Sequence, residues 1–141
     1  MDDFLKKWHA LGANVFRAEK GDRNFNLSAT TQEFLFEIGM PSEVQELNFD
    51  YLLEGLRTVN ESWELDDPAL DKYLTLGFNG SGDPVALNLD NQELVYLNHD
   101  NEYEEIFVNS DLEKFAWSAI HIVEFHSNLK KLRPDAFWCT E

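Results

Sequence analysis

Four histidines and one cysteine are the side chains in this sequence that most directly suggest metal or nucleophilic chemistry. They are His9, His99, His121, His126 and Cys139. His121 and Glu124 stand one helical turn apart, but there is no His-Glu-x-x-His pair and no second ligand beside Cys139. No Gly-x-Ser-x-Gly elbow occurs either. The sequence therefore predicts neither a metal site nor a nucleophilic enzyme.

Two short segments have compositions that could hold phosphate or calcium. Residues 77–82 contain three glycines, but their spacing differs from that of a phosphate loop and no Lys-Ser/Thr follows. Residues 100–105 alternate acidic side chains, but Glu105 stands where a calcium loop needs glycine. We interpret both segments as hairpin turns and expect no cofactor.

The 27 aspartates and glutamates leave one enzymatic alternative open. Two carboxylates can act together as acid and base, or hold a divalent ion, in a small hydrolase. No spacing in the sequence singles out such a pair. This alternative requires an acid with a strongly raised pKa in a concave pocket, and we expect a protein that is not an enzyme.

These side chains must be positioned by the elements around them, of which a β-meander over about residues 73–109 is the clearest. Strands are expected at 73–78, 84–89, 93–98 and 105–109, because runs of Val, Leu and Tyr alternate with Gly, Asn and Asp clusters. We read residues 48–52 as a further short strand and residues 61–71 as a loop with a helical turn from Pro68.

Helices are expected on both sides of the meander. Apolar residues at steps of three and four predict a helix over residues 1–11. Thr30 and Glu33 fit a capping box that begins a second helix, which Gly39 and Pro41 end. Ser110 and Glu113 fit another capping box, which begins a long last helix over about residues 111–128. Helices outside an antiparallel sheet give an α+β fold class.

The charge is strongly negative and unevenly distributed. Eleven Lys and Arg face 27 Asp and Glu, for a net charge of −16, and there is no Lys or Arg between Tyr73 and Glu113. Such a surface favours solubility, repels nucleic acid and anionic lipid, and attracts basic proteins. We therefore expect no nucleic-acid partner, no membrane partner, and a protein partner of opposite charge.

Length and cysteine content indicate one domain in a reducing compartment. A chain of 141 residues has the size of one domain with its own core. A single cysteine makes no internal disulfide, no signal peptide is recognisable, and no apolar run is long enough to span a membrane. The expected location is the cytoplasm.

Three segments resemble the immunity proteins of the SUKH superfamily. They are residues 33–41 (EFLFEIGMP), 76–89 (LGFNGSGDPVALNL) and 107–115 (FVNSDLEKF). The resemblance implies one SUKH-like domain over residues 1–141, with a curved mixed or antiparallel sheet backed by helices. It also implies an intracellular antitoxin that binds a cognate toxin domain, often a nuclease, with no catalytic residues to carry over. The N-terminal helix and residues 61–71 depart from the family pattern.

The resemblance and the charge together lead to a hypothesis for the toxin-binding surface. An acidic inhibitor can occupy the basic groove of a nuclease and gain fast association. The expected surface consists of two acidic turns, with the tyrosine as an aromatic anchor: Asp90, Glu93, Asp100, Glu102, Tyr103, Glu104 and Glu105.

Two alternatives remain beside the hydrolase. One is a general interaction or regulatory module of the same superfamily. The other is self-association through the last helix, where Trp117, Ile120 and Phe125 exceed what one core needs, so the expected state is a monomer or weak homodimer.

Overall fold

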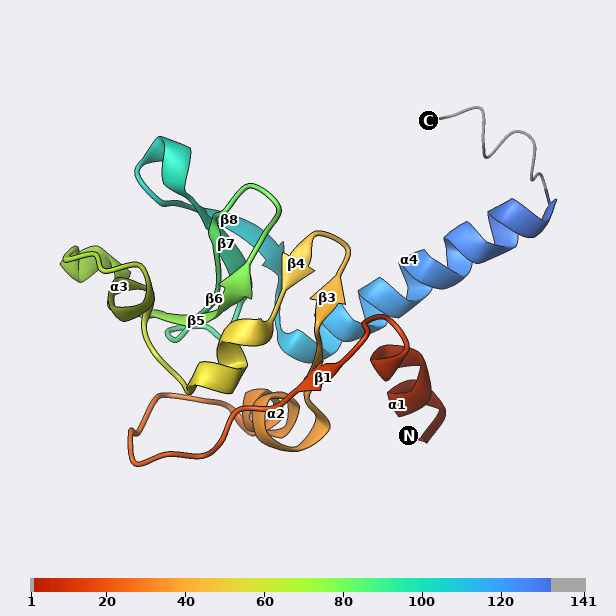
Figure 1. Ribbon diagram of the computed structural model, residues 1–141, viewed down its shortest axis with the longest axis horizontal. Coiled ribbons are helices and arrows are strands. Elements are labelled where there is room, and N and C mark those ends of the chain that lie inside the picture. Colours follow the sequence, from red (N-terminus) through yellow and green to blue (C-terminus); the bar gives the residue numbers. More distant parts are fainter. Residues whose placement is uncertain (1, 133–141) are drawn as a thin grey trace.

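The centre of the structure is a six-stranded antiparallel sheet whose strands follow one another in chain order (Figure 1). The computed structural model describes residues 2–132. The strands are β3 (Glu43–Val44), β4 (Leu47–Asn48), β5 (Tyr73–Phe78), β6 (Pro84–Asn88), β7 (Leu94–Asn98) and β8 (Glu104–Asn109). The predicted α+β class and meander are confirmed, and each of the four predicted meander strands is placed to within one residue.

The sheet curls strongly, and a hydrogen bond across it shows in which direction. Tyr73 of β5 and Glu105 of β8 are three strands apart, which on a flat sheet would separate their backbones by about 14 Å. The Tyr73 hydroxyl nevertheless donates to Glu105 Oε1 at 2.9 Å. The face that carries both side chains is therefore the inner face of the curl.

Most of the apolar core lies on the outer face. There the side chains of β5, β6 and β7 pack beneath α1 (Asp2–His9), η1 (Glu33–Ile38) and α4 (Leu112–Leu132). Trp8 is fully buried in this core, and its indole N–H donates to the Gly39 carbonyl at 3.0 Å. A smaller cluster on the inner face is closed by Val59 of α3 (Val59–Ser62) and Leu70 of η3 (Pro68–Leu70).

The second helix begins earlier than predicted and changes type along its length. Ser28, not Thr30, is the N-cap of α2 (Ala29–Gln32), and its hydroxyl accepts from the Thr31 amide. The chain continues directly as the π-helix η1 and stops, as predicted, at Gly39. Gly39 has φ +88°, a conformation that L side chains rarely adopt. The next residues form β2 (Met40–Pro41), which pairs with β1 (Val15–Phe16).

Of two local predictions between the second helix and the meander, one is wrong and one is confirmed in part. Of residues 48–52 only Asn48 lies in a strand, as the last residue of β4. Its side chain accepts from the Asp50 amide at 2.8 Å, and the chain turns there into the 3₁₀ turn η2 (Asp50–Glu54). The loop predicted over 61–71 is confirmed from residue 63 onward, but its first two residues belong to α3, which a capping box of Thr58 and Glu61 starts. The turn predicted at Pro68 is confirmed as η3.

Close approach of two strands explains one glycine of the meander. A Cβ added at Gly77 of β5 would lie 1.6 Å from the Asn48 carbonyl oxygen of β4. Any side chain there would force β4 off the sheet. Gly77 is therefore required for the step from β5 to β4.

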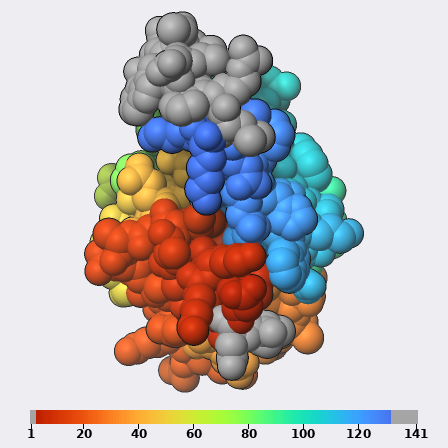
Figure 2. All heavy atoms as spheres, turned by 90° about the vertical axis from the view of Figure 1, so that its right-hand side faces the viewer, coloured from red at the N-terminus to blue at the C-terminus, as the bar shows by residue number. Residues whose placement is uncertain are grey.

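The last helix is confirmed and is longer than predicted. Its first turn is capped by Asp111, whose side chain accepts from the Lys114 amide at 2.7 Å, rather than by Ser110. The helix reaches Leu132, and residues 121–131 are exposed and extend away from the sheet (Figure 1). Figure 2 shows α4, in blue, beside the N-terminal segment, in red. Cys139 lies outside the described residues.

Candidate functional site

The two acidic turns expected to form one surface lie at opposite ends of the sheet. Residues 89–93 precede β7 and residues 99–103 follow it. A five-residue strand separates its ends by about 17 Å. The meander therefore divides Asp90 and Glu93 from Asp100 and Glu102.

The β6–β7 turn, residues 89–93, is bound tightly to the rest of the fold. The Gln92 side-chain oxygen accepts from the Ser28 amide at 3.0 Å and the Thr31 hydroxyl at 2.8 Å. Its side-chain N–H₂ group donates to the Asn26 carbonyl at 2.8 Å. Asp90 faces Lys72 at 3.9 Å, while Glu93 is half-buried. This turn therefore holds the start of α2 on the sheet.

The β7–β8 turn, residues 99–103, is fixed at its base by a buried carboxylate. Asp83 is only 5% exposed, and it accepts from the His99 amide at 3.0 Å, from the Asn79 side chain at 3.0 Å, and from the His99 ring. Burial alone would raise the pKa of Asp83, but the hydrogen bonds from His99 and Asn79 lower it below its usual value. The β5–β6 and β7–β8 turns are thereby joined at one end of the sheet.

Above this base stand three exposed carboxylates. Asp100 lies 3.3 Å from the His99 ring, and Glu104 contacts the Asn101 side chain. Glu102 has a left-handed backbone with φ +55°. Within residues 2–132, none of the three pairs with a lysine or arginine. Figure 1 shows this turn, in teal, projecting from the sheet. We refer to Asp100, Glu102 and Glu104 as the open acidic rim.

The other two predicted site residues belong to the inner face of the sheet. Tyr103 is half-buried and packs against the inner apolar cluster. Glu105 Oε1 accepts from the Tyr73 hydroxyl and from the Asn88 side chain at 2.8 Å. Burial, and then the neighbouring Glu105 carboxylate, raise the pKa of Tyr73. Of the seven predicted residues, Asp100, Glu102 and Glu104 are therefore exposed around one turn, while the exposed Glu105 is bound to Tyr73 and Asn88.

Metal binding and acid catalysis by a carboxylate each require a particular arrangement or pKa of the side chains involved. No group of three His, Cys, Asp or Glu side chains in residues 2–132 is arranged to hold a metal ion. A general acid needs a raised pKa, whereas the pKa of Asp83 is lowered. The pKa of Glu61 is lowered as well, by the Thr58 amide first and then by Arg23. No helix in the same part of the chain is apolar and long enough to cross a membrane.

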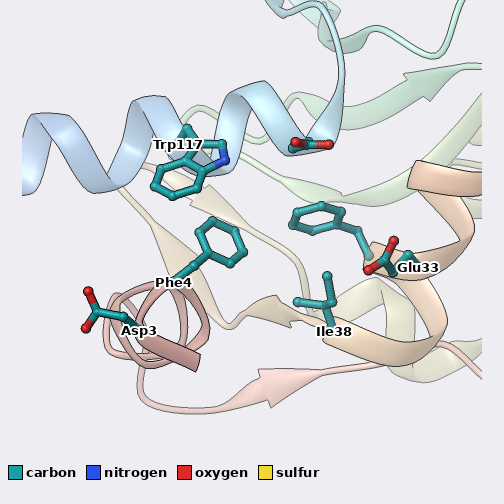
Figure 3. A pocket seen from close by; sticks show the side chains of 7 residues that line it. Asp3, Phe4, Glu33, Ile38 and Trp117 are labelled. Carbon is teal, nitrogen blue, oxygen red and sulfur yellow. The ribbon is translucent and has the colours of Figure 1, made fainter. Parts of the chain in front are cut away.

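A pocket that the sequence did not predict lies between α1, η1 and α4 (Figure 3). Its volume is about 330 Å³. It is lined by four apolar and three acidic side chains: Phe4, Phe34, Ile38, Trp117, Asp3, Glu33 and Glu113. These residues come from three separate segments, so only tertiary packing brings them together.

Comparison with known proteins gives one match. A family model described as SUKH-4 immunity protein matches residues 7–136. No curated protein and no solved structure shows a significant match to the chain.

Proposed function

The chain belongs to the SUKH-4 immunity protein family, and from this premise we propose that it neutralises a cognate protein toxin by binding it. The family match, which spans residues 7–136, is the observation that carries the proposal. An immunity protein acts by binding, so this role requires no catalytic residue. We place the encounter in the cytoplasm of the cell that is protected, with the protein acting as a monomer.

The proposed toxin is a basic domain, and a nuclease fits this description best. A net charge of −16 would hold the protein away from polyanions and draw it toward proteins that bind them. A nuclease offers a basic groove shaped for a phosphate chain. Carboxylates placed in that groove would compete with its substrate.

The open acidic rim is the part of the molecule that we propose enters the groove. Asp100 and Glu102 lie on a projecting turn, Glu104 begins β8 beside it, and none of the three has a lysine or arginine partner among the described residues. Long-range attraction from such charges increases the rate of association more than it slows dissociation. The other four predicted residues support the two turns and the sheet. The three carboxylates among them, Asp90, Glu93 and Glu105, contribute only to the overall electrostatic field.

Charge reversal of the rim tests the proposal. The toxin probe is the purified protein encoded beside this gene, mixed with the unaltered chain or with the triple variant Asp100→Lys, Glu102→Lys, Glu104→Lys. We expect association at low salt to slow by about 10- to 100-fold and its salt dependence to weaken. Stopped-flow mixing at several salt concentrations measures both. Glu105 is left unchanged because its carboxylate accepts two hydrogen bonds within the fold.

A matched control reverses three exposed glutamates elsewhere, Glu43, Glu46 and Glu54. It changes the net charge equally and should slow association only by the smaller effect of total charge. If both triple variants slow association equally, the rim is not the contact surface. If the neighbouring protein is neither bound nor neutralised by the unaltered chain, the proposed function itself fails.

A further inference from the structure

The pocket between α1, η1 and α4 combines aromatic side chains with the three carboxylates of Asp3, Glu33 and Glu113. In Figure 3, Trp117 projects from α4 over Phe4 of α1, while Glu33 and Ile38 come from η1. The Phe4 and Trp117 rings lie 4.7 Å apart and are tilted by 42°. Trp117 is 45% exposed although it packs on Phe4. Trp117 therefore lines the pocket and is still accessible to solvent.

The aromatic side chains of the pocket are held by the core behind them. Phe34 is 3% exposed and meets Phe4 edge to face at 6.3 Å. Phe34 also lies on the π-helix, where the Gly39 amide donates to the Phe34 carbonyl at 2.8 Å. Such wide helical turns are rare and are frequently found at functional sites. The pocket is thus preformed on elements that the main core fixes in place.

Two carboxylates of the pocket have no positively charged partner among the described residues. Glu33 and Glu113 make no ion pair within the described part of the chain, and no lysine or arginine lines the pocket. Asp3 lies 3.7 Å from Lys7, which also pairs with Glu124 at 3.3 Å. The described residues therefore place no lysine or arginine between Glu33 and Glu113.

We propose that this pocket receives an arginine side chain of a protein partner. The guanidinium would stack on the solvent-accessible part of Trp117, a cation–π contact, while the methylene stem lies on Phe4 and Ile38. Glu33 and Glu113 would accept its N–H groups. A flat, weakly hydrated guanidinium suits an aromatic wall better than the compact ammonium of lysine. A volume of about 330 Å³ is within the range of side-chain and small-ligand sites.

That the arginine belongs to the toxin rests on the proposed function, in which the partner is the toxin. The chemistry of the pocket does not rest on it. Figure 1 places α1 and the β7–β8 turn in different parts of the molecule. The pocket is therefore a second contact, and its test is independent of the test of the open acidic rim.

A peptide titration tests the pocket directly. The full-length protein, labelled with ¹⁵N, is titrated with acetyl-Gly-Arg-Gly-amide, and the Trp117 indole resonance is assigned with the variant Trp117→Phe. We expect a saturable shift of that resonance at millimolar peptide. The same peptide with citrulline, which keeps the shape of arginine but lacks its charge, should cause no saturable shift. Lysine in its place should bind several-fold more weakly.

Paired variants separate the pocket from the overall charge. Glu33→Gln with Glu113→Gln should weaken arginine-peptide binding by about tenfold. Glu54→Gln with Glu64→Gln removes the same charge from exposed positions elsewhere and should leave binding within about twofold. Equal weakening by both pairs would mean that total charge, not the pocket, attracts the peptide, and would overturn the proposal.

Two further outcomes are decisive. If citrulline binds as well as arginine, or if spermidine binds the pocket more tightly than the peptide, the pocket does not select an arginine side chain. If the arginine peptide binds but the neighbouring gene product does not, the pocket proposal stands and the toxin proposal fails. If the toxin binds but the arginine peptide does not shift the Trp117 resonance, the toxin proposal stands and the pocket proposal fails.

Discussion

The two acidic turns flanking β7 are similar in composition but differ in what their side chains do. In the β6–β7 turn, Gln92 reaches across to the start of α2 and Asp90 faces a lysine. In the β7–β8 turn, the bonds that fix the backbone lie below, at Asp83, and the carboxylates above project into solvent. The difference shows that acidity along the chain does not by itself define a binding surface. A carboxylate is available to a partner only where other groups hold the backbone.

The largest difference between the two turns should appear when the hydrogen bonds of the Gln92 side chain, which hold the β6–β7 turn, are removed. Gln92→Ala deletes hydrogen bonds to Ser28, Thr31 and Asn26. We expect it to lower the free energy of unfolding by about 2–3 kcal/mol. Urea unfolding followed by tryptophan fluorescence measures the change.

The matched variant in the second turn is Asn101→Ala, which removes one contact, to Glu104. Its expected cost is below about 0.5 kcal/mol. Similar losses in the free energy of unfolding for Gln92→Ala and Asn101→Ala would show that both turns support the fold equally. The proposed difference between the two turns would then be wrong.

The next largest effect concerns the base of the second turn. Asp83→Asn replaces a buried acceptor with a group that places an N–H₂ beside other donors, and we expect it to cost about 1–2 kcal/mol at pH 6. The folded-state pKa of Asp83 lies below that of an unfolded aspartate. Its contribution is therefore complete above about pH 4, the unfolded pKa, and is lost as the pH falls through the folded pKa.

The stability gap between the unaltered chain and Asp83→Asn should accordingly narrow below pH 4. Unfolding curves at pH 6, 4 and 3 follow this gap. A gap that stays constant over this range would mean that the Asp83 charge contributes nothing to the turn.

The smallest expected effect compares two adjacent glutamates on β8. Glu105→Ala removes the acceptor of Tyr73 and Asn88 and should cost about 1 kcal/mol. Glu104→Ala, at the edge of the open acidic rim, should change stability by less than about 0.5 kcal/mol. Thermal unfolding of the two variants side by side resolves the difference. A larger cost for Glu104→Ala would assign it to the fold and remove it from the rim.

Much of this fold could be predicted because its signals are local. Gly and Asn turns mark the four meander strands, and Gly39 marks a helix end. Helix starts were displaced by one or two residues because neighbouring polar side chains compete for the cap. Ser28 took the place of Thr30, and Asp111 that of Ser110. The strand expected at residues 48–52 does not continue past Asn48 for a similar reason, since the Asn48 side chain accepts a hydrogen bond from the Asp50 amide.

The candidate site was less predictable because it depends on long-range geometry. A meander places successive turns at opposite ends, and this rule could have separated Asp90 from Asp100 in advance. The hydrogen bonds of Glu105 to Tyr73 and Asn88 and the packing of Tyr103 on the inner cluster follow from the curl of the sheet, which no local pattern specifies. The pocket around Trp117 joins α1, η1 and α4, and the π-helical turn within it has no signal in the sequence.

The position of β8 gives its charges a consequence for self-assembly. In the described sheet β8 is an outer strand, next to β7 alone. An outer strand offers its backbone to any similar strand, and native proteins discourage such pairing with charge. Glu104 and Glu105 at the start of β8 would repel a second copy of the same strand, so these carboxylates help to keep the chain from aggregating in a crowded cell even before a partner arrives.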